Sequence, residues 1–290
     1  MADGALKAAL KNGEMIVAPG IYDLISGLIA DNMGFKALYV TGYGTVASYL
    51  GLPDAGLATY TDMLTRVAQI AEKTKTPIIA DADTGYGGLL NIRHTVRGYE
   101  HAGVTAIQFE DQVSPKKCGH TPYREVVSID EMTRKIQVAC DSRSSDDFLI
   151  VARTDARTGY GIDEAIKRGQ AYAAAGADVI FIESPETEEE LKLIGERIDA
   201  PLLANMVNGG KTPMLPAAKL AELGYQIAIF PAAGFLSAGA ALEAAYGELR
   251  NHGTSTGETA MYDFPAFTRM LGFEDIWEFE RKYLVNAAEN

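Results

Sequence analysis

The sequence is poor in cysteine, poor in basic residues and free of long apolar runs. Its two cysteines, Cys118 and Cys140, are too few for a disulfide framework in 290 residues, and the start of the chain lacks a basic and then apolar leader. We therefore expect a protein of the reducing cytoplasm. No apolar stretch approaches the roughly 20 residues of a membrane-spanning helix, so we expect no membrane partner.

Acidic residues outnumber basic ones, 39 to 26, and the formal net charge is −13. This balance argues against nucleic acids and anionic membranes as partners, because there is no basic surplus to neutralise phosphate groups. A small anionic ligand would need a locally positive pocket. With 47% hydrophobic and 22% charged residues, the chain is long enough for one large α/β barrel or for two domains, and we favour the single barrel.

Apolar runs alternate with amphipathic segments along residues 1–250. The predicted strands are 15–20, 37–42, 77–83, 107–111, 148–155, 178–183, 201–207 and 226–231, and the predicted helices are 22–33, 60–74, 91–102, 128–143, 162–175, 186–197, 214–223 and 232–250. Eight alternations predict a closed (β/α)8 TIM barrel as the catalytic domain. A doubly wound sheet is the alternative, but it would need a phosphate-binding loop, for which Gly42-Tyr43-Gly44 is a weak match.

Residues 251–290 differ in character from the barrel. A polar linker at 251–257 precedes an aromatic, amphipathic segment at 264–287, which contains Phe264, Trp277 and Tyr283. Such a segment must bury its apolar side. We expect this tail to form a helical unit that docks on a neighbouring subunit.

Polar residues recur where the predicted strands end. Because the carboxyl ends of all strands meet at one mouth of a barrel, and because catalytic groups gather there, these side chains are predicted to converge. They are Thr41, Asp81, Asp83, Glu110, Asp111, Arg153, Asp155, Glu183 and Asn205.

Four carboxylates of this mouth predict a divalent metal site. Asp81 and Asp83 are two residues apart on one strand and point to the same face, with Glu110 from the next strand and Asp54 from a loop. An all-oxygen site suits Mg²⁺ or Mn²⁺ rather than zinc. The alternative is a solvated strand end, but crowded carboxylates repel one another unless a cation lies between them.

The metal site in turn predicts an anionic substrate. Mg²⁺ keeps several waters and usually also binds a substrate anion, so a 2-oxo or 2-hydroxy acid is the expected ligand. Thr41 and the backbone amides of Gly42 and Tyr43 are candidates to hold one carboxylate. Arg153 and His120 supply cations for a second one, and arginine offers a bidentate grip.

The loop after the fourth predicted strand contains Cys118. Lys116, Lys117 and His120 surround it, and these cations favour the thiolate, which makes the sulfur a usable acid or base. The alternative is a solvated lysine turn with an inert cysteine. We favour the functional interpretation, because an exposed free thiol is otherwise a liability.

Several motifs between about residue 10 and residue 250 resemble the isocitrate lyase / phosphoenolpyruvate mutase superfamily. The resemblance implies a (β/α)8 barrel, a bound Mg²⁺ and a last helix exchanged between the subunits of a homotetramer. The Cys-Gly-His sequence is similar to the lyase branch. The matching motifs are Asp81-Ala82-Asp83-Thr84-Gly85-Tyr86-Gly87, Glu110-Asp111-Gln112, Pro115-Lys116-Lys117-Cys118-Gly119-His120, Ala152-Arg153-Thr154-Asp155-Ala156 and the segment Asn205 to Pro213.

The resemblance also implies an activity and residue roles. A metal-bound 2-hydroxy acid loses its hydroxyl proton, its C2–C3 bond breaks to release a 2-oxo acid, and Cys118 protonates the departing carbanion. Tyr39 stands where family members carry a tyrosine proposed as general base. The remaining roles are substrate binding by Gly119 and stabilisation of the second fragment by Arg153, His120 and Asn205. Glu183 is a candidate to orient Arg153 or to hydrogen-bond a substrate carboxyl group, and the alternative is a solvated strand end.

Two positions bear on the substrate. Family members that cleave methylisocitrate carry arginines for the third carboxylate where this chain has Leu236 and, near the second position, Phe264. A buried carboxylate without its cation costs several kcal/mol, so the expectation is a dicarboxylate such as 2,3-dimethylmalate, cleaved to pyruvate and propionate. The alternatives are carboxyphosphonoenolpyruvate phosphonomutase activity, oxaloacetate hydrolysis, methylisocitrate cleavage, and a metal-dependent oligomeric binding protein without catalysis.

Overall fold

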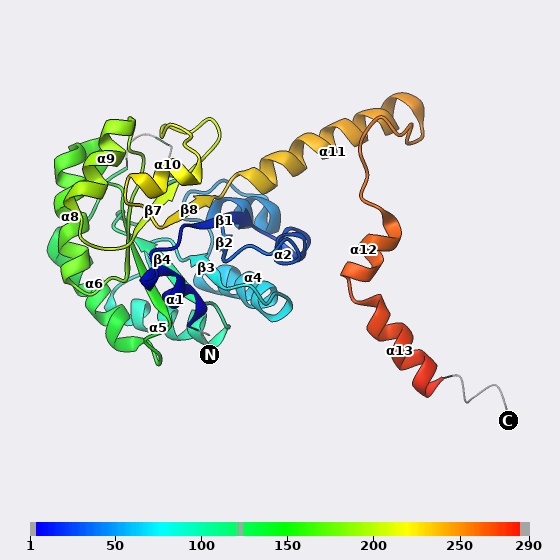
Figure 1. The fold of residues 1–290 in the computed structure, drawn as a ribbon, viewed down its shortest axis with the longest axis horizontal. Coiled ribbons are helices and arrows are strands. Elements are labelled where there is room, and N and C mark those ends of the chain that lie inside the picture. The colour runs from blue at the N-terminus through cyan, green and yellow to red at the C-terminus, as the bar shows by residue number, and fades with distance from the viewer. Residues whose placement is uncertain (1–3, 120, 122–123, 285–290) are drawn as a thin grey trace. The chain divides into compact units, whose positions relative to one another are not determined.

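The computed structural model describes residues 4–119, 121 and 124–284 and contains a closed barrel of eight parallel strands in sequence order (Figure 1). The last strand returns to the first, with Ile16 opposite Ile227. The predicted barrel is therefore confirmed, and the doubly wound sheet is excluded. The chain divides into two compact units, Met1–Phe235 and Leu236–Asn290, and the whole barrel belongs to the first.

The eight strands are short and each falls within one residue of a predicted apolar run. Their side chains are almost entirely buried, because helices cover the outside and side chains fill the inside. They are β1 (Ile16–Ile21), β2 (Leu38–Val40), β3 (Ile78–Asp81), β4 (Ala106–Glu110), β5 (Leu149–Thr154), β6 (Val179–Ile182), β7 (Leu202–Asn205) and β8 (Ile227–Phe230).

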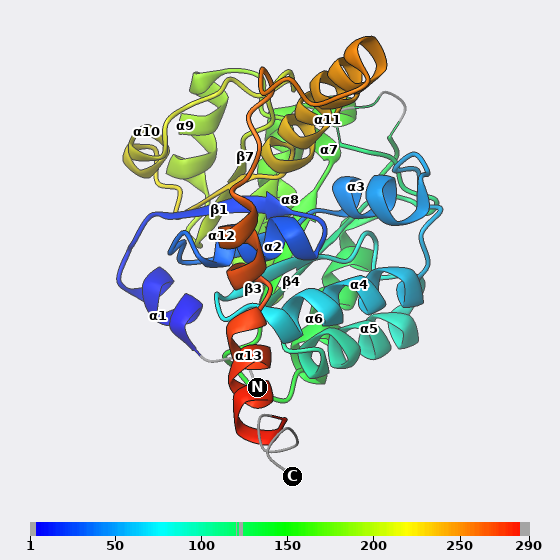
Figure 2. The ribbon, with the colours of Figure 1, turned by 90° about the vertical axis from the view of Figure 1, so that its right-hand side faces the viewer.

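The helices follow the strands as predicted, with some additions. Those of the first unit are α1 (Ala5–Lys11), α2 (Leu24–Asp31), α3 (Gly42–Thr45), the π-helix η1 (Val46–Leu50), α4 (Tyr60–Lys73), α5 (Leu89–His101), α6 (Ile129–Ser142), α7 (Ala156–Tyr160), α8 (Ile162–Ala174), α9 (Glu188–Arg197) and α10 (Ala217–Glu222). The helices α1, α3, η1 and α7 were not predicted. Around the barrel α2 packs on α4, α4 on α5, α5 on α6, and α6 on α8 (Figure 2).

Side chains cap the first turns of several helices. Asp23 accepts a hydrogen bond from the amide of Ser26 at the start of α2, and Thr59 forms a capping box with Asp62 at the start of α4. At the start of α6, Ser128 is the capping residue, because its hydroxyl accepts from the amide of Glu131.

The alternation of side chains along the strands sets what the barrel interior contains. Odd-numbered residues of β3 and β5 point inward. From the lower end of the barrel to the mouth, the inward side chains are Ile79 and then Asp81 on β3, and Leu149, Val151 and then Arg153 on β5. Apolar side chains thus fill the lower layers and charged side chains the layer at the strand carboxyl ends. Leu6 and Leu10 of α1 join the interior cluster, so this helix covers its lower end.

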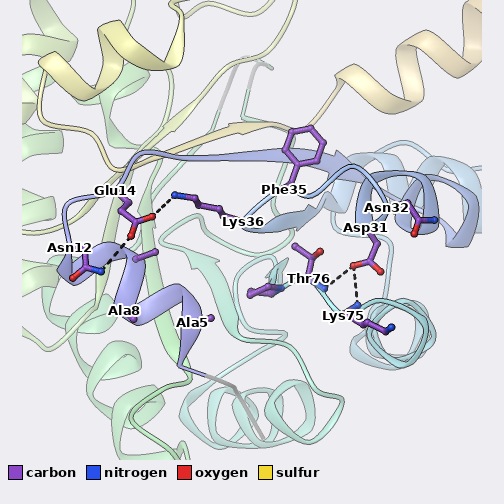
Figure 3. Close-up of a pocket in the computed structure, with 12 residues that line it drawn as sticks. Ala5, Ala8, Asn12, Glu14, Asp31, Asn32, Phe35, Lys36, Lys75 and Thr76 are labelled. Atoms are coloured by element: carbon purple, nitrogen blue, oxygen red, sulfur yellow. Dashed lines mark hydrogen bonds and ion pairs between the residues drawn. The ribbon is translucent and has the colours of Figure 1, made fainter.

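A cavity of about 540 Å³ opens at the opposite end of the barrel from the polar layer (Figure 3). Residues of α1 and residues before β2 and β3 line it. Three of its charged side chains already have partners, because Lys36 pairs with Glu14, and Asp31 accepts from the amides of Lys75 and Thr76. This cavity therefore does not coincide with the predicted site.

The second unit is helical. It contains most of α11 (Ala233–His252), then α12 (Phe264–Met270) and α13 (Phe273–Tyr283), and Asp263 caps α12 through the amide of Ala266. Many of its aromatic side chains are exposed, including Phe264 and Trp277. Exchange of this segment between subunits stays a prediction. Of the helices in the described ranges, none has the length and apolarity needed to cross a membrane.

Candidate active site

Asp81 is fixed by hydrogen bonds from three directions. Its Oδ1 accepts from the amide of Asp83 at 3.0 Å and from Gln108 Nε2 at 3.4 Å, and its Oδ2 accepts from the amide of Gly42 at 3.3 Å. Burial raises the pKa of Asp81, which Lys116 partly offsets. A Cβ on Gly42 would lie 2.5 Å from Asp81 Oδ2, so only glycine permits this approach.

Asp83 carries the second carboxylate and adopts a left-handed backbone with φ 49°. This conformation is uncommon for a residue other than glycine and marks a constrained turn directly after β3. Lys116 Nζ lies 2.7 Å from Asp83 Oδ1 and also pairs with Asp54. Burial raises the pKa of Asp83 to about 6, although Lys116 counteracts the shift.

The structure brings the four predicted metal ligands to one region but does not form a four-carboxylate cage. Within the described ranges, no three histidine, cysteine, aspartate or glutamate side chains lie closely enough to hold an ion together. The ammonium of Lys116 instead lies between Asp54 and Asp83, and the buried Oδ1 of Asp83 has an ion pair there but no well-aligned hydrogen bond. The site therefore fits a cation, and Mg²⁺ commonly uses one or two carboxylates with water as its other ligands.

Glu110 lies at the end of β4 beside Arg153. Its Oε1 accepts from Gln112 Nε2 at 2.8 Å, and its Oε2 lies 3.4 Å from Arg153 Nη1. Burial raises the pKa of Glu110 well above its usual range, and Arg153 opposes this shift. The carboxylate of Glu110 thus lies between the side-chain amide of Gln112 and the guanidinium of Arg153.

Arg153 projects into the mouth from the end of β5. Asp155 fixes it through two hydrogen bonds of 2.9 Å, to Nε and Nη2, and the guanidinium also lies 3.4 Å from both Glu110 and Glu183. Its Cζ is 5.1 Å from the ring centre of Phe181. Burial lowers the pKa of Arg153, but the three carboxylates outweigh burial and raise it well above its usual range.

A second buried network supports Arg153 from the helix side. Asp111 faces away from the barrel interior and accepts from Tyr172 Oη at 2.6 Å, Arg168 Nη1 at 3.0 Å and the amide of Asp155 at 2.9 Å. The sequence predicted Asp111 and Asp155 for the mouth but missed Arg168 and Tyr172. The sequence did contain a signal for these two residues: Arg168 lies one helical turn before Tyr172, on the apolar face of the predicted helix 162–175 that becomes the buried face of α8.

Glu183 and Asn205 are neighbours at the ends of β6 and β7. Asn205 Nδ2 donates to Glu183 Oε2 at 3.0 Å, and the Ser184 hydroxyl donates to Glu183 Oε1 at 3.0 Å. Asn205 Oδ1 is buried and has no hydrogen bond within the described part of the chain. A buried acceptor of this kind is available to a bound molecule.

The segment with Cys118 lies over this mouth. The amide of Cys118 donates to the carbonyl of Asp54 at 3.2 Å, and Gln112 exchanges two hydrogen bonds with the backbone of Lys117, at 2.8 and 3.0 Å. The Ser184 hydroxyl donates to the carbonyl of Gly119 at 3.2 Å. The structure therefore brings Cys118 to the same end of the barrel as the acidic cluster.

Gly119 packs so closely that a side chain has no room. A Cβ there would collide with Arg153 Nη2 and lie 2.9 Å from Glu183. We expect Gly119→Ala to lower kcat/KM by about 100-fold, because displacing the predicted catalytic segment by about an ångström has costs of this size. Steady-state kinetics test this, with Gly88→Ala as the control, since a Cβ at Gly88 meets no atom within 4 Å. Equal kinetics for both variants would contradict the placement.

The remaining predicted residues take different positions. Tyr39 is buried and donates to Gln108 Oε1 at 2.6 Å, and burial raises its pKa well above its usual range, so its general-base role stays a prediction. Thr41 is buried at the end of β2, whereas the Tyr43 ring is 45% exposed and stacks on Phe235 at 5.3 Å. His120 lies outside the described residues.

Comparisons with known proteins agree on one group of enzymes. The family model for phosphoenolpyruvate phosphomutase matches residues 6–250. The chain is 50% identical to 2,3-dimethylmalate lyase of Eubacterium barkeri, over 96% of each chain. It is 41% identical to 2-methylisocitrate lyase of Aeropyrum pernix, over 93% of this chain and 87% of that protein.

Solved structures are similar over nearly the whole chain. Oxaloacetate acetylhydrolase in complex with 3,3-difluorooxalacetate has a TM-score of 0.91 at 36% identity, with 96% of each chain covered. Phosphonopyruvate hydrolase in complex with oxalate and Mg²⁺ has a TM-score of 0.88 at 31% identity, covering 98% of this chain and 100% of that one.

Proposed function

The chain belongs to the phosphoenolpyruvate mutase/isocitrate lyase superfamily and is a carbon–carbon lyase, and from this premise we propose that it cleaves 2,3-dimethylmalate, or a closely similar 2-hydroxy dicarboxylate, to pyruvate and propionate. The observation that carries the proposal is the 50% identity to 2,3-dimethylmalate lyase over 96% of both chains. The interpretation as a binding protein without catalysis is set aside, because the similar proteins are named lyases.

Arg153 is the proposed anchor for one substrate carboxylate. Asp155 holds the guanidinium in one orientation through Nε and Nη2, which leaves Nη1 directed toward Glu110 and the mouth. A fixed guanidinium binds a carboxylate without first losing side-chain freedom. The buried Oδ1 of Asn205 supports a substrate bound at this place, because a substrate hydroxyl would satisfy it.

Asp81 and Asp83 are the proposed ligands of a divalent ion, with Asp54 and Glu110 acting directly or through water. The cation already paired with Asp83 supports this choice, and so does the Mg²⁺ in the phosphonopyruvate hydrolase structure. When bound, such an ion stabilises negative charge on the 2-hydroxyl and carboxylate oxygens of the substrate. The chain itself supplies a buried, water-poor mouth in which these charges interact strongly.

Cys118 is the proposed acid. Once the 2-hydroxyl has given its proton to a general base, the role predicted for Tyr39, the C2–C3 bond breaks, its electron pair moves to C3, and C2 becomes the carbonyl carbon of pyruvate. The thiol then gives its proton to C3, which yields propionate. The backbone contacts of Cys118 with Asp54 and of Gly119 with Ser184 support this role, because they attach the Cys118 segment to the end of the barrel that carries Arg153 and the acidic residues.

The substrate range is tested by comparing 2,3-dimethylmalate with methylisocitrate, with pyruvate release followed directly. Leu236 and Phe264 provide no cation for a third carboxylate, and a buried carboxylate without its partner costs roughly 3–5 kcal/mol. We therefore expect kcat/KM for 2,3-dimethylmalate to be at least about 100-fold higher. Absence of pyruvate from 2,3-dimethylmalate would contradict the proposal.

Oxaloacetate hydrolysis is a second candidate, favoured by the similarity to oxaloacetate acetylhydrolase. Both reactions break a carbon–carbon bond. In the hydrolysis water attacks the substrate, whereas in the lyase reaction the 2-hydroxyl loses its proton and C3 is protonated after the bond breaks. Oxaloacetate hydrolysis releases acetate and oxalate and consumes water. Product analysis by NMR with both substrates distinguishes the candidates, because propionate arises only from the dimethylmalate reaction.

A further inference from the structure

Lys116 is a buried lysine inside a cluster of acids. Its side chain is 5% exposed, and the side chains of Asp54 and Asp83, with which it pairs, are 6% and 7% exposed. Buried lysines are rare unless they are paired, because the charged form loses its hydration. The pairing is therefore the reason that this side chain occupies the site.

The surroundings keep Lys116 charged. Its ammonium lies 2.7 Å from Asp83 Oδ1 and also pairs with Asp54, so it is held as a cation between two carboxylates. A protonated ammonium has three donors and no lone pair, so it cannot be a ligand of a metal ion. It can only compete with one for the same oxygens.

The ammonium of Lys116 and a divalent ion would compete for the same oxygen of Asp83. Lys116 Nζ lies 2.7 Å from Asp83 Oδ1, and a magnesium ion bound to that oxygen would lie roughly 2.0–2.1 Å from it. Two positive charges this close together in a buried site repel strongly. Binding of a divalent ion to this oxygen therefore weakens its contact with Lys116.

Building on the proposed function, we propose that Lys116 is an internal counter-cation that holds Asp54 and Asp83 together before metal binding and is displaced from Asp83 when a divalent ion binds. Lys116 is two residues before Cys118, and the backbone of Lys117 between them stays attached to Gln112. Metal binding therefore changes one of the contacts that hold the Cys118 segment. Lys116 acts as a positioning residue.

Metal affinity without substrate tests the exchange. Calorimetric titration of metal-free protein with Mg²⁺ should give about tenfold tighter binding for Lys116→Met than for wild type, because the competing cation is gone. Without metal, the variant should melt at a lower temperature, since its carboxylates then repel one another. Lys117→Met is the matched control: it removes the same charge from an exposed side chain of the same segment and should bind Mg²⁺ like wild type.

Amine labelling tests the exchange in the wild-type protein, even if a variant does not fold. Acetylation followed by peptide mass spectrometry should show Lys116 protected without Mg²⁺ and several-fold more labelled with Mg²⁺, while Lys117 labelling stays constant. Mg²⁺-independent labelling of Lys116, or unchanged Mg²⁺ affinity in Lys116→Met, would overturn the inference. These readouts need no substrate, so the inference can fail while 2,3-dimethylmalate is cleaved, or hold while it is not.

Discussion

Replacing Cys118 with alanine is expected to lower kcat for 2,3-dimethylmalate cleavage by about two to four orders of magnitude, the usual contribution of a positioned acid. The side chain is partly exposed at the mouth, and its backbone is fixed to Asp54, so the substitution removes the thiol without removing those contacts. KM should change little, because the thiol acts on a carbanion that does not exist in the bound substrate.

Cys140→Ala is the control for this experiment. Cys140 is the other cysteine of the chain, and its sulfur donates to the carbonyl of Gly176 at 3.2 Å, on the outer helix α6. Burial raises the pKa of Cys140, so it remains a thiol near neutral pH. Its removal should leave kcat unchanged. Full activity of Cys118→Ala, measured by steady-state pyruvate release, would eliminate the proposed acid.

Arg153→Lys is expected to lower kcat/KM by about two to three orders of magnitude, because truncating a buried, hydrogen-bonded charge costs roughly 2–5 kcal/mol. Lysine keeps the positive charge but lacks the planar set of N–H donors of the guanidinium group. It cannot occupy both oxygens of Asp155 and still direct a third donor toward Glu110. The carboxylate of the substrate would then meet a mobile ammonium in place of a fixed guanidinium.

Arg143→Lys provides the matched comparison. Arg143 pairs with Asp178 at 2.6 Å and with the carbonyl of Phe148 at 2.9 Å, beside the starts of β5 and β6. This substitution should lower the melting temperature but leave kcat/KM near the wild-type value. If Arg143→Lys and Arg153→Lys lose activity equally, the loss comes from a destabilised fold, and the proposed role of Arg153 in binding the substrate carboxylate is contradicted.

The barrel was predictable because its strands are almost purely apolar and its helices are amphipathic. The period of two along each strand also placed Asp81 toward the interior and Arg153 in the mouth. It did not place Asp83, which was predicted on the same strand but follows β3 in a left-handed turn. The same period separates Glu110, which faces the interior, from Asp111, which faces α8. That distinction was available from the sequence, but the prediction assigned both residues to the mouth.

Other features depend on contacts that the sequence does not encode locally. Lys116 and Asp54 are 62 residues apart, and only the folded loops bring them together. The motif around Cys118 therefore suggested cations beside a thiol, whereas the structure places one of those cations among the predicted metal ligands. The helix α1 was missed because it is short and covers the barrel with only Leu6 and Leu10.

We expect this mouth to cleave its substrate only when a divalent ion occupies the acidic cluster near the Cys118 segment. The most direct measurement is pyruvate release from 2,3-dimethylmalate by enzyme stripped with a chelator, before and after Mg²⁺ is restored. We predict near-complete loss of turnover in the stripped enzyme and full recovery on adding Mg²⁺. Turnover at the full rate without any divalent ion would contradict the account.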